Sequence, residues 1–149
     1  MKQSDAIFSS KNDEWETPQS IFDELDKEFH FTLDPCSTHK NHKCPQYFTK
    51  EEDGLSQKWG GGVVFCNPPY SQVSKWVAKC HEESKTDGIT IVLLIPARTD
   101  TRYFHDYIYQ RTEIRFIKGR LHYEIDGEGK NSSPFPSMVV IFRGAKAKV

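Results

Sequence analysis

The stretch GVVFCNPPY at residues 62–70 decides how the fold of this chain is interpreted. Its first five residues carry no charged or amide side chain, which is typical of a buried strand. Its last four, Asn67-Pro68-Pro69-Tyr70, make a stiff exit from that strand, because proline fixes φ and has no N–H to donate. Ligands of open α/β sheets bind beyond the carboxyl ends of strands. We therefore expect a binding site at this turn.

The turn offers hydrogen-bond acceptors beside an aromatic face. The side-chain oxygen of Asn67 and the backbone carbonyl of Pro68 can accept hydrogen bonds from both N–H groups of a planar amine. Tyr70 can stack on a base that has been flipped out of a duplex. The tetrapeptide alone leaves open an alternative, a strand followed by an ordinary Pro-Pro turn.

The pattern of apolar residues on both sides of this turn predicts one α/β domain. Expected helices begin at Thr17, with Pro18 in the first turn, at Ser71, and at Thr99 or Asp100. Expected strands cover residues 31–33, 62–66, 89–95, 113–118, 121–125 and 137–142, with 35–61 irregular and 127–133 a loop. We expect 62–66 and 89–95 to be adjacent parallel strands of a mostly parallel sheet with antiparallel edge strands.

Composition excludes several classes of protein. With 149 residues, 13% of them aromatic and 28% charged, the chain has the composition of one globular domain. No window approaches the roughly 18 apolar residues of a membrane span, and the first residues lack the apolar core of a signal peptide. We expect a cytoplasmic protein without a membrane partner, whose four cysteines are reduced. The chain has no Walker or G-x-S-x-G motif.

Charge is unevenly distributed along the chain. The net charge is −1 overall, but it is −6 over residues 1–34 and +3 over residues 98–120. A neutral protein that is polarised in this way can present a basic face to nucleic-acid phosphates. The alternative is that these are ordinary solvated surface charges.

Six short motifs follow one another in a fixed order. They are Trp15-Glu16-Thr17-Pro18, Asp34-Pro35, Asp53-Gly54-Leu55, Asn67-Pro68-Pro69-Tyr70, IPARTDT at 95–101 and PFPSM at 134–138. Together, over about residues 12–143, they resemble the phage-encoded Dam family of DNA adenine-N6 methyltransferases. The resemblance implies an abbreviated Rossmann-like fold dependent on S-adenosyl-L-methionine (AdoMet). It also implies an adenine flipped out of DNA as the substrate, and a phage or prophage protein in a bacterial cytoplasm.

The resemblance also implies roles for individual residues. Thr17 and Pro18 match the motif that contacts AdoMet from the N-terminal side. Asp34 and Pro35 match the motif that lies beside the methionine portion of AdoMet. Asp53 matches the acidic position that accepts a hydrogen bond from the adenine amine of AdoMet. Asn67, Pro68 and Tyr70 match the catalytic motif. The expected substrate contacts are Pro69, Phe135 and a basic set, Arg98, Arg102, Arg115, Lys118 and Arg120, which should face the DNA backbone while the acidic N-terminal third faces away.

The chain also departs from the wider methyltransferase pattern. The turn after Asp34 has no glycine, and Asp34 and Asn67 are only 33 positions apart. We expect a flexible segment at 1–14, a methyltransferase domain at 15–143 and a basic tail at 144–149. The segments 98–111 and 119–137 are then the ones expected to select the DNA sequence.

Three alternative interpretations remain at this point. Cys36, His39, His42 and Cys44 are residue types that bind zinc, but their spacing does not match common zinc motifs, so no metal is expected. The protein could instead bind nucleic acid with a degenerate methyltransferase fold that no longer catalyses methyl transfer. It could also methylate RNA or a protein amide by the same acceptor chemistry.

Overall fold

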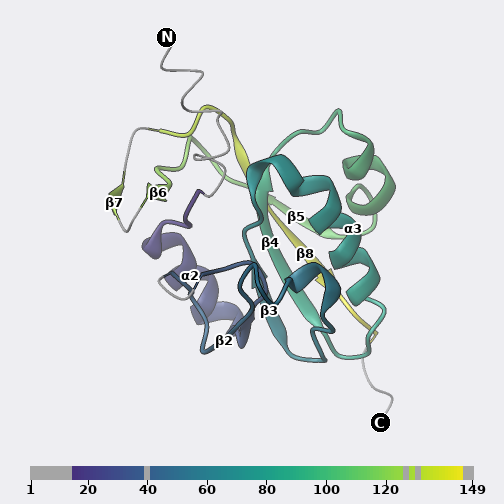
Figure 1. Cartoon of the computed structure of the whole chain (residues 1–149). Coiled ribbons are helices and arrows are strands. Elements are labelled where there is room, and N and C mark those ends of the chain that lie inside the picture. Colours follow the sequence, from purple (N-terminus) through teal and green to yellow (C-terminus); the bar gives the residue numbers. More distant parts are fainter. Residues whose placement is uncertain (1–14, 39–40, 126–127, 130–131, 146–149) are drawn as a thin grey trace.

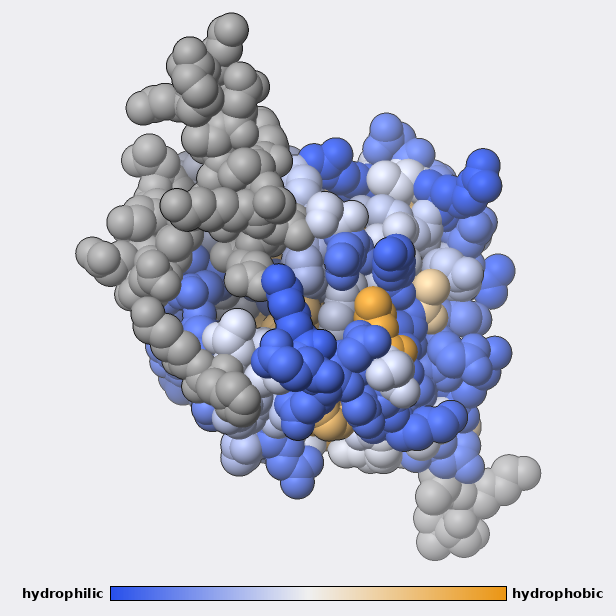
Figure 2. Space-filling view, viewed as in Figure 1, coloured by the Kyte–Doolittle hydropathy of each residue, from blue (hydrophilic) through white to orange (hydrophobic). Residues whose placement is uncertain are grey.

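The computed structural model describes residues 15–38, 41–125, 128–129 and 132–145. The segment expected to be flexible, residues 1–14, lies outside the described residues, as do residues 146–149 of the expected basic tail and His39. Within the described part, no helix is long and apolar enough to cross a membrane. The face seen in Figure 2 is mainly hydrophilic, with only small hydrophobic spots.

A six-stranded mixed sheet forms the centre of the molecule, in the order β2-β1-β3-β4-β8-β5 (Figure 1). The strands are β1 (Leu33–Asp34), β2 (Gln46–Tyr47), β3 (Val63–Cys66), β4 (Thr90–Pro96), β5 (Glu113–Phe116) and β8 (Ser137–Arg143). Strands β1 to β4 pair in parallel, whereas β8 is antiparallel to both β4 and the edge strand β5. The expected parallel pairing of residues 62–66 with 89–95 is confirmed, and so is the antiparallel pairing at one edge.

Helices cover both faces of this sheet, since the strands alternate between two cores. Helix α2 (Gln19–Phe29) buries Phe22 and Leu25 against Phe65 and Val92 on one face. Helix α3 (Val73–Glu83) and a π-helical segment (Phe104–Ile108) pack on the other face, against β3 and β4 side chains that point the opposite way. Figure 1 shows α2 and α3 on opposite sides of the sheet. This is the Rossmann-like arrangement that the resemblance implies.

The expected helix caps are wrong. Helix α2 begins after Pro18, which makes no side-chain cap. Thr17 is buried, and its hydroxyl oxygen accepts a hydrogen bond from Asn67 instead of capping the helix. Helix α3 follows a 3₁₀ turn (Tyr70–Gln72), so Gln72 rather than Ser71 precedes it. The segment expected to start at Thr99 or Asp100 is the π-helix described above, and Thr101 Oγ1 accepts a hydrogen bond from the backbone N–H of Phe104 at 3.3 Å.

Several strand boundaries also differ from expectation. Residues 35–61 are not wholly irregular, because they contain β2 and a 3₁₀ turn (Gly54–Ser56). Pro96 does not lie beyond β4 but is its last residue, paired with Ser137. The strand expected at 121–125 is reduced to β6 (Glu124–Ile125), which pairs with β7 (Glu128–Gly129) inside the expected loop, apart from the main sheet.

Candidate active site

The polar ends of three strands meet at one edge of the sheet. Strands β1, β3 and β4 are parallel neighbours, so Asp34 at the end of β1 and Asn67 just after β3 come to the same edge. Strand β8 runs the other way, and its first residue, Ser137, pairs with Pro96 at the end of β4. Phe135, which precedes β8, therefore reaches the same edge as the ends of the parallel strands.

A cavity of about 940 Å³ opens at this edge. The predicted site residues that line it are Thr17, Asp34, Pro35, Asp53, Asn67 and Pro69. Most of its remaining wall comes from Trp15, from residues 36–38, 49–50 and 54–55, and from the first turn of α3. The other predicted site residues do not line this cavity. They are Pro18, Pro68, Tyr70, Arg98, Arg102, Lys118, Arg120 and Phe135. The structure thus brings together most residues expected to hold AdoMet and one member of the expected catalytic set.

The side chain of Asn67 has a fixed orientation. Its Nδ2 donates hydrogen bonds to the backbone carbonyl of Trp15 and to Thr17 Oγ1, the latter at 3.0 Å. A carbonyl can only accept, so the amide nitrogen and not the oxygen must face Trp15. Among the described residues no donor is hydrogen-bonded to Asn67 Oδ1. An acceptor oxygen is therefore available at the end of β3.

The segment that orients Asn67 is itself held in place. Glu16 and Glu124 form an antiparallel bridge with two backbone hydrogen bonds, each of 2.9 Å. The bridge ties residues 15–17 to β6, in the region expected to select the DNA sequence. Thr17 is only 3% exposed, which restricts its side chain to one packed position. The N-terminal motif thus lies beside the turn at Asn67, and its bridge to β6 holds it there.

Asp34 is a buried carboxylate at the wall of the cavity. It is 5% exposed and accepts hydrogen bonds from the backbone N–H groups of Cys36 and Lys43, at 3.2 and 3.3 Å. Burial raises the pKa of Asp34 to about 7, although these two N–H donors and the nearby positive charges act to lower it. The ammonium group of Lys43 donates to Gln19 and not to this carboxylate. Asp34 is therefore suited to a cationic ligand.

Residues Asp53-Gly54-Leu55 form a tight turn that accounts for the aspartate and the glycine at these positions. Asp53 has φ of 58°, and its carboxylate accepts a hydrogen bond from the backbone N–H of Leu55 at 3.2 Å. A Cβ added to Gly54 would lie 2.0 Å from the carbonyl oxygen of Pro35, so only glycine fits there. The Asp53 turn consequently packs directly on the turn that follows β1.

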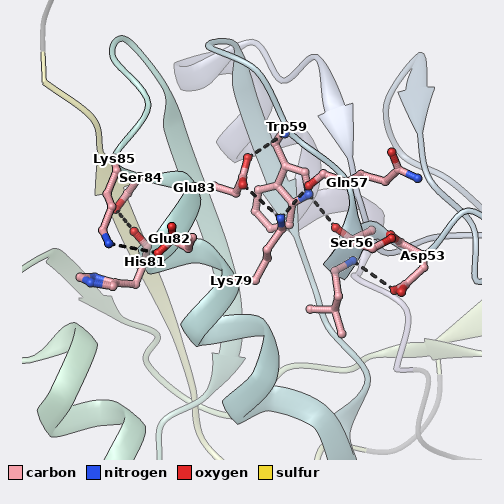
Figure 3. Close-up of polar contacts among 12 residues, drawn as sticks. Asp53, Ser56, Gln57, Trp59, Lys79, His81, Glu82, Glu83, Ser84 and Lys85 are labelled. Atoms are coloured by element: carbon pink, nitrogen blue, oxygen red, sulfur yellow. Dashed lines mark hydrogen bonds and ion pairs between the residues drawn. The ribbon is translucent and has the colours of Figure 1, made fainter.

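A partly buried ion pair anchors the continuation of this turn to α3 (Figure 3). Glu83 accepts hydrogen bonds from the backbone N–H of Trp59, at 2.7 Å, and from Lys79 Nζ, at 3.0 Å. Lys79 Nζ also donates to the carbonyl of Gln57. Trp59 Nε1 in turn donates to the carbonyl of Gly54 at 2.9 Å. These contacts fix the cavity wall that carries Asp53 to a rigid helix.

Tyr70 lies in an aromatic cluster next to the cavity. Its ring makes an edge contact with Phe135, with centroids 4.9 Å apart, and Phe135 also contacts Trp15 and Tyr123. Phe135 is only 6% exposed. Its ring thus supports Tyr70 from the side, and the expected contact of Phe135 with the target base stays a prediction.

The expected basic face is only partly assembled. Arg102 and Lys118 are exposed, and Arg120 is exposed while donating to the carbonyl of Ser133 at 3.3 Å. Arg115 forms two 2.7 Å hydrogen bonds with Glu28 of α2 and one of 2.8 Å with Glu113, so its charge is already paired, and its contact with DNA stays a prediction. Hydrogen bonding from Arg115 lowers the pKa of Glu28. The acidic N-terminal third thus touches the basic segment at this point, and the two are not separated.

The sequence did not reveal every important residue. Trp15 stands in the first of the six motifs, but its residue type alone indicates no role at the site. The backbone N–H of Lys43, which donates to Asp34, could not be identified from sequence, because the two residues meet only in the folded chain.

Among the described residues, no group of three or more His, Cys, Asp or Glu side chains is arranged to hold a metal ion. His42 Nδ1 instead lies 2.9 Å from the carbonyl of Cys44, and the His42 ring stacks on Tyr47.

Comparison with known proteins shows which family this chain resembles. A protein named DNA N-6-adenine-methyltransferase from Haemophilus phage HP1 (strain HP1c1) is 29% identical over 138 residues, which cover 89% of this chain and 80% of that protein. A protein of the same name from Escherichia phage T1 is 30% identical over 117 residues, 77% of this chain but 49% of that protein. The putative methyltransferase YfdM of Escherichia coli (strain K12) is 37% identical over 65 residues, 39% of this chain and 71% of that protein. The family described as DNA N-6-adenine-methyltransferase (Dam) matches residues 4–149. The chain therefore belongs to the Dam family.

Proposed function

We propose that this protein transfers a methyl group from AdoMet to the N6 amine of an adenine flipped out of DNA. The observation that carries the proposal is the orientation of Asn67. Its nitrogen is occupied by Trp15 and Thr17, and its oxygen is left to accept at the rim of a cavity that is large enough for a nucleoside. The family membership supports the same activity.

The cavity fits AdoMet chemically. Asp34 is buried with N–H donors and, among the described residues, forms no ion pair, which suits the positively charged methionine portion. Apolar groups of Leu55 and Trp76 line the same space and suit an adenosine ring. Asp53 projects from the Gly54 turn at the cavity wall, where its carboxylate can take an amine hydrogen bond. When bound, AdoMet supplies an electrophilic methyl group on a sulfonium.

Asn67 acts on the amine that attacks this methyl group. The lone pair of the adenine N6 amine is conjugated with the ring, which makes the amine a poor nucleophile. Hydrogen bonds accepted by Asn67 Oδ1 and by the carbonyl of Pro68 draw the amine towards tetrahedral geometry and free the lone pair. The rigid exit from β3 holds both acceptors in place before the reaction, and such preorganised electrostatics supply much of the rate enhancement in enzymes.

Tyr70 and the basic surface act on the DNA. The ring of Tyr70 offers a stacking surface next to the acceptors, which suits a base that has left the duplex. Arg102, Lys118 and Arg120 are exposed cations available to the phosphate backbone. Their contacts position the duplex and do not depend on its sequence.

Incubation with labelled AdoMet and mixed-sequence DNA, followed by digestion to nucleosides, tests the proposal. We expect label in N6-methyladenine and in no other nucleoside. Asn67→Ala should lower the rate by roughly 10²-fold or more, by analogy with the loss of one oxyanion-hole donor, while AdoMet affinity stays within a few fold. Parallel reactions with RNA and with protein substrates complete the experiment. Label in RNA or protein but not in DNA, or wild-type turnover by Asn67→Ala, would exclude the proposal.

A further inference from the structure

We propose that Thr17 is a positioning residue for catalysis, whose hydroxyl oxygen holds the Asn67 amide so that Oδ1 faces the target amine. This inference rests on the proposed function. It goes beyond the contact with AdoMet that the sequence motif implies for Thr17, because it gives the hydroxyl a role in the chemical step.

The first support is the geometry of the hydrogen bonds around Asn67. The Nδ2 group has two hydrogens, and it has two acceptors, the Trp15 carbonyl and Thr17 Oγ1. Exchange of the amide nitrogen and oxygen would place Oδ1 against the Trp15 carbonyl, and two acceptors repel each other. The Trp15 carbonyl therefore excludes the exchanged orientation, and the Thr17 hydroxyl, which can accept or donate, is the second acceptor in the orientation that leaves Oδ1 to the substrate.

The second support is that, among the residues that the structure describes, the Thr17 hydroxyl makes no hydrogen bond other than the one with Asn67. It does not cap α2, although it stands in the right place in the sequence, since the helix begins after Pro18 without a side-chain cap. The residue is buried, and a branched side chain packed in this way keeps one rotamer. Its oxygen is thus a fixed acceptor for the Asn67 amide.

The third support is the way in which the Thr17 backbone is held. The bridge between Glu16 and Glu124 fixes the residues on either side of Glu16, and these carry the two acceptors of Asn67. Thr17 and Asn67 are 50 positions apart in sequence, so their contact exists only because β6 and the end of β3 place both chains at the same edge. A catalytic group held from a separate, anchored segment loses little freedom at the moment of reaction.

The experiment compares Thr17→Val, which keeps the shape but removes the acceptor, with Thr17→Ser, which keeps the acceptor. We expect Thr17→Val to lower kcat about tenfold, the size of one hydrogen bond, and Thr17→Ser to restore kcat to within about threefold of wild type. AdoMet affinity, measured by calorimetry, should change much less than kcat in both. Thr112→Val is the matched control, since the Thr112 hydroxyl donates only to the carbonyl of Ile108, at the far end of the π-helical segment.

A double-mutant cycle separates positioning from general structural damage. In an Asn67→Ala background, Thr17→Val should lower the residual rate no further, because the group that it positions is gone. Thr17→Ala repeats the test if Thr17→Val does not fold, as judged by its melting temperature. Unchanged kcat with weakened AdoMet binding, an equal loss in Thr17→Ser, or additive losses in the cycle would overturn the inference. If wild-type protein methylates DNA while any of these results is found, the inference alone fails; if wild type shows no methylation, the proposed function fails first.

Discussion

The guanidinium of Arg98 lies over the ring of Tyr70, 5.2 Å from the ring centroid, and donates a hydrogen bond to the Tyr70 hydroxyl. Arg98 follows β4 and Tyr70 follows β3, so the parallel pairing of these strands brings the two side chains together. A cation on one aromatic face excludes a base from that face. A flipped adenine can stack there only after the Arg98 side chain has moved.

Tyr70 should contribute to base capture through its ring and not through its hydroxyl. Tyr70→Ala is expected to lower kcat/KM for DNA by about 5- to 150-fold, since one base stack is worth about 1–3 kcal/mol. Tyr70→Phe keeps the ring, removes the hydroxyl that Arg98 binds, and should retain kcat/KM within a few fold. Steady-state methylation kinetics measure both. Equal losses in the two variants would mean that the hydroxyl, and not stacking, is the functional group.

The phosphate contacts should come from Arg102 and Arg120 and not from Arg115. Removal of one cation that binds a phosphate reduces the slope of log affinity against log salt by about one, so the Arg102→Ala, Arg120→Ala double variant should show a slope smaller by about two. AdoMet binding should not change. Arg115→Ala is the control, because Glu28 and Glu113 already neutralise this cation. A double variant with the wild-type slope would place the DNA on another face.

Asp34 should destabilise the ligand-free protein at neutral pH. Burial raises its folded-state pKa from 3.8 to about 7, so between these values the folded protein keeps a proton that the unfolded chain has lost. The free energy of unfolding therefore falls as pH rises through this range, by up to about 4 kcal/mol. Asp34→Asn removes this effect and should raise the melting temperature at pH 8, with a smaller gain at pH 5. Thermal melts at the two pH values measure this.

The same carboxylate should make AdoMet binding depend on pH. A cationic ligand favours ionised Asp34, so wild-type affinity is expected to rise between about pH 6 and pH 8 and then level off. Asp34→Asn should bind AdoMet weakly and without this rise, and calorimetry in buffers of different pH tests both statements. A variant that is more stable yet still binds AdoMet as tightly as wild type would show that Asp34 does not contact the cofactor.

Gly54 should be intolerant of any side chain. A Cβ at this position would lie 2.0 Å from the Pro35 carbonyl, and overpacking of this kind typically costs about 1–3 kcal/mol. Gly54→Ala should lower the free energy of unfolding by that amount and weaken AdoMet binding, because the Asp53 turn must move away from Pro35. Gly61→Ala is the control, with its nearest atom at 3.2 Å and no contact with the cavity. Chemical denaturation and calorimetry measure both effects, and wild-type binding by a destabilised Gly54→Ala would separate the turn from the cofactor.

Local sequence was sufficient for the elements that have a strong periodic pattern. The apolar runs that form β3, β4 and β8 could be predicted because a strand buried on both faces needs uninterrupted apolar residues. Helix α2 could be predicted from its apolar face, although not its cap. The position of Asn67 beyond the end of β3 also followed from sequence, because the two prolines must leave the strand at that point.

Other features depend on contacts between distant parts of the chain. Strand β2 consists of two residues, and a pattern that short carries no periodic signal, so its pairing with β1 appeared only in the structure. The same is true of the ion pair between Arg115 and Glu28, which joins residues 87 positions apart in sequence.

The sequence by itself determined the order of the motifs, the residue types of the site and the class of fold, since each of these depends on residues that are close together in the sequence. The tertiary structure alone decided which way Asn67 faces, because its orientation depends on a carbonyl and a hydroxyl some 50 residues away. It also decided that Asp34 is buried and that Phe135 is buried in edge contact with Tyr70. Hydrogen bonds and burial between segments are set by how strands pair, and the pairing is not encoded in any one stretch of residues.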